Sequence, residues 1–273
     1  MALYYASINS GSNGNAYYVG NARHAVLIDA GLACRTMEAR LQELGLDVKK
    51  LRAIFISHEH SDHIRGVNVF AKKHALPVYI SGGSYRGSSI QLPTSQLHII
   101  KGEGSIGIAD LQIHFFSKSH DAQEPHSFTI SHLHTTVGVF TDIGQPCKQV
   151  QVHFHQCHAA FLESNYDEDM LQNGSYPFVL KKRISSAIGH LSNTQALELF
   201  LHHASPGLQH LVLSHLSKEN NSPAAAAATF APHSHRTKIT VASRERASEL
   251  FFVSATHLQK TAKPVGKQIT LFS

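Results

Sequence analysis

Short apolar runs separated by polar turns dominate the pattern of hydrophobic and polar positions along this chain. Apolar runs of about four to eight residues predict strands, and apolar residues at helical spacing, as at Met37, Leu41 and Leu44, predict helices. The expected strands span 3–9, 15–19, 24–29, 51–57, 77–80, 97–100, 111–117, 126–131, 136–141, 159–163, 209–214 and 238–243. The expected helices span 35–46, 67–74, 146–158, 166–173, 193–204 and 224–228.

Strands dominate each half of the chain, and helices are interspersed among them. Because a sheet must bury its apolar face against another layer, this order favours an α/β fold of two packed sheets with helices outside. No linker or internal repeat interrupts the pattern, so residues 1–273 are expected to form a single domain. The weakly patterned tail after about residue 255 is expected to be partly mobile.

Apolar residues make up 42% of the chain, and no run of about 18 apolar residues predicts a membrane helix. The first residues lack the basic and apolar stretches of a secretory signal. Cys34, Cys147 and Cys157 lack the spacing of a disulfide framework or a zinc site, so we interpret them as free thiols. These features predict a cytoplasmic protein that does not associate with membranes.

The formal net charge is +5 and the sequence pI is about 9.1. Excess positive charge suits an anionic partner such as nucleic acid, but it also favours solubility, and charge alone leaves both interpretations open. The chain also contains 22 histidines, several times the average share. Histidine is the commonest metal ligand, but only the arrangement of these residues can separate ligands from bystanders.

One segment concentrates candidate metal ligands. His58, His60, Asp62 and His63 lie within six residues and directly follow the apolar strand expected at 51–57. On an exposed turn, His58 and His60 can point one way while Asp62 and His63 point another, which suits two adjacent metal ions. Neutral imidazoles and carboxylates match borderline or hard divalent metals.

The spacing His-x-His-x-Asp-His resembles the hallmark of the metallo-β-lactamase superfamily. His120, Asp142 and His215 match the later ligand positions of that superfamily, and each lies just after an expected strand, where a rigid element can present it. The resemblance implies one metal held by His58, His60, His120 and Asp142, and another held by Asp62, His63, Asp142 and His215, with Asp142 bridging the two.

The metals themselves are expected to be two divalent ions. The three histidines of the first site favour zinc, whereas the more oxygen-rich second site tolerates manganese or iron. A hydroxide held between two such ions is a good nucleophile at neutral pH, and the ions offset charge on a transferring phosphoryl group. Asp62 is expected to help orient or deprotonate that nucleophile.

Further segments point to one branch of the superfamily. No cysteine occupies a second-site position, unlike in many β-lactamases. Six segments occur in an order similar to that of the WalJ (YycJ) family: 10–16, 27–32, 119–122, 162–167, 189–193 and 213–221. The resemblance covers roughly residues 1–245. It implies the four-layer αββα sandwich and a 5′-to-3′ exonuclease activity on double-stranded DNA.

Two more residues acquire roles by resemblance to ribonuclease Z. His190 matches a histidine that assists the leaving group, and Glu163 matches a glutamate near that histidine. Such a pair suits phosphodiester cleavage, because a departing alkoxide must be protonated or stabilised. A helix-entry histidine and a structural carboxylate are the competing interpretations.

Weaker signals concern substrate contacts. Asn13 lies in a polar, glycine-rich loop that could approach a phosphate, although a simple hairpin turn explains the loop equally well. Further candidate contacts are Asn165, Ser217, Lys218 and Asn220. The histidines at 153, 155 and 158 imitate a metal cluster, but we expect them to be structural.

The leading hypothesis is a phosphodiesterase, most specifically an exonuclease, in which a metal-bridging hydroxide attacks phosphorus in line. The first alternative is a small-molecule hydrolase, either a cyclic phosphodiesterase or a thioesterase resembling glyoxalase II. The second is a non-catalytic regulatory or DNA-binding protein with a vestigial metal site. The complete set of candidate ligands argues against the second alternative.

Overall fold

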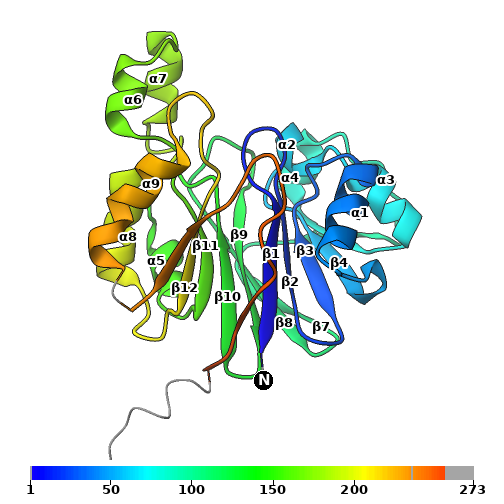
Figure 1. The fold of residues 1–273 in the computed structure, drawn as a ribbon. Helices are drawn as coiled ribbons and strands as arrows, with labels where there is room; N and C mark the ends of the chain where they lie inside the picture. Colours follow the sequence, from blue (N-terminus) through cyan, green and yellow to red (C-terminus); the bar gives the residue numbers. More distant parts are fainter. Residues whose placement is uncertain (1, 235, 256–273) are drawn as a thin grey trace, which may run out of the picture.

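The computed structural model describes residues 2–234 and 236–255. Within these residues, two seven-stranded sheets face each other and helices cover both outer faces (Figure 1). This arrangement confirms the four-layer αββα sandwich expected from the sequence. The tail expected to be mobile, after about residue 255, lies outside the described residues.

The two sheets have the same number of strands and meet through their apolar faces. The first sheet has the order β14 (Phe251–Val253), β1 (Leu3–Asn9), β2 (Ala16–Gly20), β3 (Ala25–Ile28), β4 (Leu51–Phe55), β5 (Val78–Ser81) and β6 (Leu97–Ile100). The second sheet has the order β13 (Lys238–Val241), β12 (His210–Ser214), β11 (Ala159–Glu163), β10 (Thr135–Phe140), β9 (His126–His132), β8 (Leu111–Ser117) and β7 (Gly104–Ile108).

Helices flank the sheets on separate sides. The first sheet is flanked by α1 (Cys34–Glu43), α2 (Ser61–Ile64), α3 (Val67–His74) and α4 (Gly82–Gly87), with the short turn η1 (Val48–Lys50) leading into β4. The second sheet is covered by α5 (Lys148–Phe154), α8 (Asn193–His203) and α9 (Pro223–Phe230), and η2 (Ala231–His233) follows α9. The pair α6 (Glu168–Asn173) and α7 (Phe178–Ile184) projects beyond the end of the sheets (Figure 1).

Large apolar side chains fill the space between the sheets. Tyr5, Tyr17, Phe55, Phe128 and Phe161 are fully buried there. Separate apolar clusters join each sheet to its own helices. Burial of these side chains supplies the main favourable term for folding, and it holds the ends of the strands in fixed positions.

The sequence pattern predicted most elements within a few residues, but it missed β7, β14, α2, α4 and α7. β7 has the sequence GSIGI, and its two glycines weaken the strand signal. α4 contains three glycines in six residues, which hides a helix from propensity. Both elements are held by their neighbours rather than by their own sequence.

Parallel pairing places the carboxyl ends of several strands at one edge of the sandwich. β3, β4 and β5 run parallel in the first sheet, and β10, β11 and β12 run parallel in the second. In open parallel sheets, ligands bind outside the carboxyl ends of the strands. Every candidate metal ligand follows such an end or the end of β8, so the fold gathers these residues at one edge.

Candidate metal centre

The segment from His58 to His63 turns inward after β4. His58 and His63 are fully buried, so the expectation of an exposed turn is wrong for these two residues. The reason lies in the backbone: the amide of Asn15 donates to the carbonyl of Asp62 at 2.7 Å, and the amide of Ala30 donates to the carbonyl of His63 at 2.9 Å. These bonds draw the segment against the loops that follow β1 and β3.

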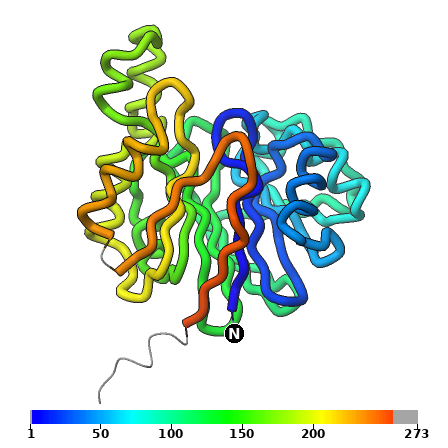
Figure 2. Tube along the Cα trace, viewed as in Figure 1, coloured from blue at the N-terminus to red at the C-terminus, as the bar shows by residue number. Residues whose placement is uncertain are grey.

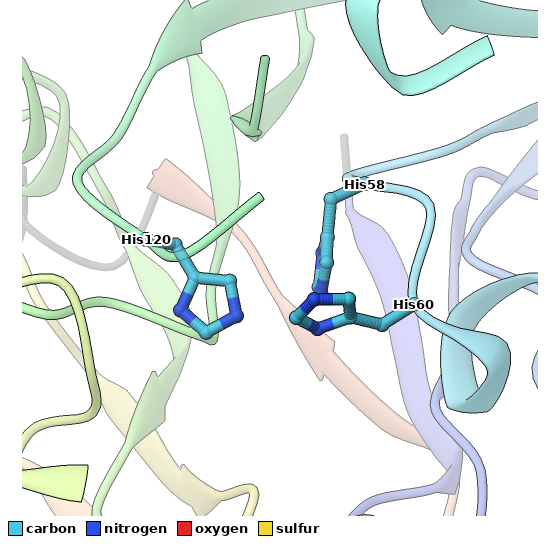
Figure 3. A group of neighbouring side chains, drawn as sticks. All are labelled: His58, His60 and His120. Carbon is cyan, nitrogen blue, oxygen red and sulfur yellow. The ribbon is translucent and has the colours of Figure 1, made fainter. Parts of the chain in front are cut away.

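The structure brings one group of three histidines together. His58, His60 and His120 each offer a ring nitrogen, and these atoms lie within 4.8 Å of one another. Figure 3 shows that His120 approaches from one segment and that His58 and His60 approach from another, with the rings turned toward one another. This group corresponds to the histidines assigned to the first metal.

A second group lies beside the first. Asp62, His63 and His215 offer ligand atoms that also lie within 4.8 Å of one another. Asp142 stands between the groups, with Oδ2 at 3.3 Å from Nε2 of His63 and Oδ1 at 3.4 Å from Nε2 of His215. Oδ1 of Asp142 is also 3.8 Å from Nε2 of His120. The carboxylate of Asp142 can therefore reach both the group of three histidines and the second group.

Three residues at this edge have left-handed backbone conformations. Asp29 and His215 directly follow β3 and β12, and Asp142 lies two residues after the end of β10; their φ angles are 63°, 57° and 56°, respectively. Residues other than glycine adopt positive φ only when the surrounding structure enforces it, and such residues gather at functional sites. The fold therefore holds these side chains in their orientation at a cost in backbone energy.

The buried histidines share one hydrogen-bonding scheme, in which Nδ1 is engaged and Nε2 is left toward the centre. The Nδ1 partners are Ser57 Oγ for His58 (2.9 Å), Asp29 Oδ2 for His63 (2.8 Å), the Gly189 carbonyl for His120 (3.0 Å) and Glu163 Oε1 for His215 (3.0 Å). Metal-ligating histidines characteristically bond a second group through the ring nitrogen that does not face the metal.

Several buried polar atoms at this centre have no hydrogen-bond partner, and they show whether metal ions would fit between them. Within the described residues, Nε2 of His58, His120 and His215 and Oδ2 of Asp142 are buried and have no hydrogen-bond partner. Buried polar atoms without partners are rare and costly. Imidazole nitrogens and a carboxylate oxygen that converge in this way are the donor set of a divalent metal site, so the residues fit the ions.

Protonation differs between the two groups. Burial lowers the pKa of His120 to about 4 and that of His58 well below its usual value, so both rings are neutral, as ligands must be. Burial also opposes protonation of His215, but Asp142 and Asp62 outweigh it and raise the pKa of His215.

Glu163 and His190 form a pair at the border of the metal centre. Glu163 is fully buried, and its Oε1 accepts a hydrogen bond from Nδ1 of His190 at 2.8 Å. Burial alone would raise the pKa of Glu163, but His190 and His215 outweigh it and hold the pKa at about 2. The side chain of His190 is 20% exposed, so its Nε2 is the ring atom available to a substrate.

Sequence reasoning missed three residues that support the centre. Asp29 holds His63, and the buried Lys118 donates from Nζ to the carbonyl of Thr141 at 2.6 Å, next to Asp142. Asp121 forms an ion pair with Arg183 of α7. A polar residue placed directly after a buried strand, as Asp29 is, could have indicated its role.

The candidate substrate contacts divide by exposure. The side chains of Asn13 and Lys218 are exposed, and Ser217 is partly exposed. Asn165 and Asn220 are buried instead, and Nδ2 of Asn165 donates to the carbonyl of His215 at 2.7 Å. Asn165 is thus placed to orient His215. Nδ2 of Asn13 donates to the carbonyl of Arg244, whereas Lys218 and Ser217 lie at the surface, where a substrate can reach them.

The histidines near residue 155 lie away from this centre. The ring of His153 stacks on Phe116 with the ring centroids 3.9 Å apart, and Nε2 of His153 lies 3.2 Å from Glu103. Neither His155 nor His158 joins a group of potential ligands in the described part of the chain. These contacts account for His153 as a packing residue.

The chain is similar to known proteins of one superfamily. Residues 10–145 match the metallo-beta-lactamase superfamily. The chain is 33% identical over 224 residues to exodeoxyribonuclease YycJ of Bacillus anthracis, a match that covers 81% of this chain and 85% of the relative. It is 32% identical over 222 residues to exodeoxyribonuclease WalJ of Streptococcus pneumoniae, with 80% and 82% covered.

A solved structure of the same fold is the metallo-beta-lactamase fold protein YhfI of Bacillus subtilis. The TM-score is 0.71 at 17% identity, and the match covers 92% of this chain and 98% of that protein. At this identity the likeness concerns the fold alone. None of the helices in residues 2–234 and 236–255 has the length and apolar character needed to cross a membrane.

Proposed function

Since the chain belongs to the family of the exodeoxyribonucleases YycJ and WalJ within the metallo-β-lactamase superfamily, we propose that it is a dinuclear metal-dependent 5′-to-3′ exonuclease that acts on double-stranded DNA. The family consists of hydrolases. The step from hydrolase to exonuclease rests on the named activity of these two relatives and on the pairing of His190 with Glu163.

In this proposal, His58, His60 and His120 hold the first metal and Asp62, His63 and His215 hold the second, with Asp142 shared between them. The supporting observation is the convergence of buried, unpartnered ligand atoms from four separate segments. Divalent ions bound there would lower the pKa of a water molecule and offset the charge of the phosphoryl group. The ion best suited to the first group is zinc, and manganese or iron would be tolerated in the second.

The remaining chemistry belongs to the side chains. Asp62 is partly exposed, with 17% of its side chain accessible, so its carboxylate can orient an attacking water or accept its proton. His190 would assist the leaving oxygen through Nε2, while Glu163 fixes the ring through Nδ1. A leaving alkoxide requires a proton, whereas the thiolate released from a thioester can depart without one.

The single observation that carries the proposal is the 2.8 Å bond between Glu163 Oε1 and His190 Nδ1 at the border of the metal centre. It combines a general acid with a ligand set that suits phosphoryl transfer. The three free thiols agree with a reducing, cytoplasmic location.

A degradation assay tests the function. Metal-loaded protein is incubated with end-labelled duplex DNA, alongside the His60→Ala and Asp142→Ala variants. Wild-type protein should release nucleotides progressively from the 5′ ends, and both variants should be inactive. Equal degradation by wild-type protein and the variants would reject a metal-dependent nuclease.

The same protein preparation distinguishes a nuclease from the main alternative, a small-molecule hydrolase. A cyclic phosphodiester and a glutathione thioester are offered in place of DNA. Turnover of either compound without degradation of duplex DNA would assign the centre to small-molecule hydrolysis.

A further inference from the structure

A pocket of about 380 Å³ lies beside the segment that follows His215. Its wall is formed by the residues after His215, by Ser10, and by the segment that connects β13 to β14. Figure 2 shows this connecting segment, in orange, passing close to the loop after β1, in blue. Ligand pockets of this size combine a few fixed polar groups with a shaped wall.

The most informative atom of this pocket is a nitrogen of Arg244. Nη1 of Arg244 is buried, and no hydrogen-bond partner for it exists among the residues that the structure describes. A buried guanidinium nitrogen without a partner costs free energy, because its water has been removed and nothing has replaced it. Arg244 also lines the pocket, so a rotation of its guanidinium group would bring this nitrogen to an acceptor on a ligand bound there.

The backbone around Arg244 is fixed. The amide of Ser10 donates to the carbonyl of Ser243 at 3.2 Å, and Nδ2 of Asn13 donates to the carbonyl of Arg244 at 2.7 Å. Arg40 donates to the carbonyl of Glu245. The backbone is therefore held on both sides of Arg244, so this part of the pocket is already formed before a ligand binds.

The charge of the wall is positive. Lys218, Arg244 and Arg246 line the pocket, and Glu245 is the acidic residue among its lining residues. Hydroxyl groups of Ser217 and Ser243 add polar character. Guanidinium groups bind phosphate through paired hydrogen bonds, so this set of side chains favours a phosphate oxyanion.

The loop that touches the pocket also touches the metal ligands. Ser10 lines the pocket, and its Oγ accepts from the amide of His215 at 2.7 Å. Nδ2 of Asn15, in the same loop, lies 3.2 Å from Asp62 Oδ2 and 3.1 Å from His63 Nε2. The pocket and the second group of ligands are therefore connected through one short segment, from Ser10 to Asn15.

We propose that this pocket binds the terminal 5′-phosphate of a DNA strand through Arg244, and so selects chain ends over internal positions. The inference rests on the proposed exonuclease function. A terminal phosphomonoester carries about 1.5 to 2 negative charges at neutral pH and three acceptor oxygens, which exceeds the single charge of an internal phosphodiester. A cationic pocket connected to the metal centre through this loop therefore favours the end of the strand.

Binding of an uncleavable duplex tests the pocket separately from catalysis. Metal-loaded protein is titrated with short duplexes whose first linkages are phosphorothioates, and fluorescence anisotropy compares a 5′-phosphate end with a 5′-hydroxyl end. Wild-type protein should bind the phosphorylated duplex about tenfold or more tightly, the range for a charged hydrogen bond. In the Arg244→Gln variant, the ratio of the affinities for the 5′-phosphate and 5′-hydroxyl duplexes should fall close to one.

Two further variants control the test. Arg52→Gln removes the same charge from an exposed position at the start of β4, opposite the metal edge, and should keep the wild-type preference. Arg244→Lys keeps the charge but loses the paired geometry, and should retain part of the preference. The proposal would be overturned if wild-type protein bound the two duplexes equally tightly, or if Arg244→Gln kept the wild-type ratio of affinities.

Competition separates the possible sources of phosphate. Inorganic phosphate and a 5′-deoxymononucleotide are added to the bound, phosphorylated duplex. The mononucleotide should displace the phosphorylated end in wild-type protein. If inorganic phosphate bound at Arg244 while the two duplexes bound equally, the pocket would be a small-anion site and the chain-end assignment would be wrong. Failure of DNA degradation alone would leave this binding result intact and reject only the proposed function.

Discussion

Oδ2 of Asp29 lies 2.8 Å from Nδ1 of His63, and both side chains are fully buried. Asp29 also accepts hydrogen bonds from the amide and the hydroxyl of Ser57, which in turn contacts Nδ1 of His58. One carboxylate thus fixes the ring of His63 directly and that of His58 through Ser57. Its own φ of 63° shows that the fold accepts backbone strain to place it.

Asp29→Asn should weaken metal binding by about 10- to 100-fold, because the amide cannot reproduce the charge that orients His63 and raises its basicity. Competition with a chromophoric chelator measures the affinity for zinc. Asp47→Asn, an exposed position that caps the turn before β4, is the matched control and should bind zinc as wild-type protein does. If the Asp29→Asn variant bound zinc as tightly as wild-type protein, Asp29 would have no role in metal binding.

His190→Ala should lower kcat on duplex DNA by about 10²- to 10⁴-fold with little change in KM, because the leaving oxygen then departs without a proton. A duplex with sulfur in place of that bridging oxygen needs no such proton, so it should restore most of the lost rate. Persistence of the full defect on the sulfur-containing duplex would assign His190 a structural role instead.

Gly31→Ala should destabilise the protein by about 1–3 kcal/mol or more, because an added Cβ would lie 1.7 Å from the carbonyl oxygen of Asp62. The clash is with backbone, which cannot rotate away. Gly107→Ala is the matched control, since its Cβ would meet no heavy atom closer than 3.7 Å. Urea unfolding of both variants measures the difference, and similar midpoints would contradict this account of the loop.

Stability should fall as the pH drops from about 7 to 4, in part through His210. Burial lowers the pKa of His210 to about 4, so the folded protein keeps this ring neutral while the unfolded chain protonates it below about 6.5. Tyr5 and Thr240 bond its two nitrogens. The resulting loss is about 2 kcal/mol between pH 7.5 and pH 5.

His210→Gln isolates that contribution. The drop in unfolding free energy between pH 7.5 and pH 5 should be about 2 kcal/mol smaller in this variant than in wild-type protein. Identical drops in the two proteins would show that the protonation of His210 does not contribute.

Much of this molecule could be predicted from the sequence, because periodicity and strand ends carry local information. The layers of the sandwich follow from short apolar runs. The grouping of His58, His120 and His215 was expected from the resemblance of their motifs to the metallo-β-lactamase superfamily, and each lies shortly after a strand. β7 escaped prediction because an edge strand with two glycines is defined by pairing with β8 rather than by its own residues.

The orientation of the centre could not be predicted in the same way. The burial of His58 and His63 depends on backbone bonds to residues more than 30 positions earlier, such as that between Ala30 and His63. Likewise, Arg244 lies beside Gly11 and Asn13 only in the folded chain. Contacts of this kind arise from tertiary packing, which a linear pattern does not encode.

Metal stoichiometry measured together with activity tests the central claim most directly. Metal-free protein is titrated with zinc or manganese while bound metal and degradation of duplex DNA are followed in the same samples. Our account predicts two ions for each chain, with activity appearing as the second ion binds, and at most one tightly bound ion and no activity in Asp142→Asn. A single ion at full activity, or activity that does not depend on metal, would contradict it.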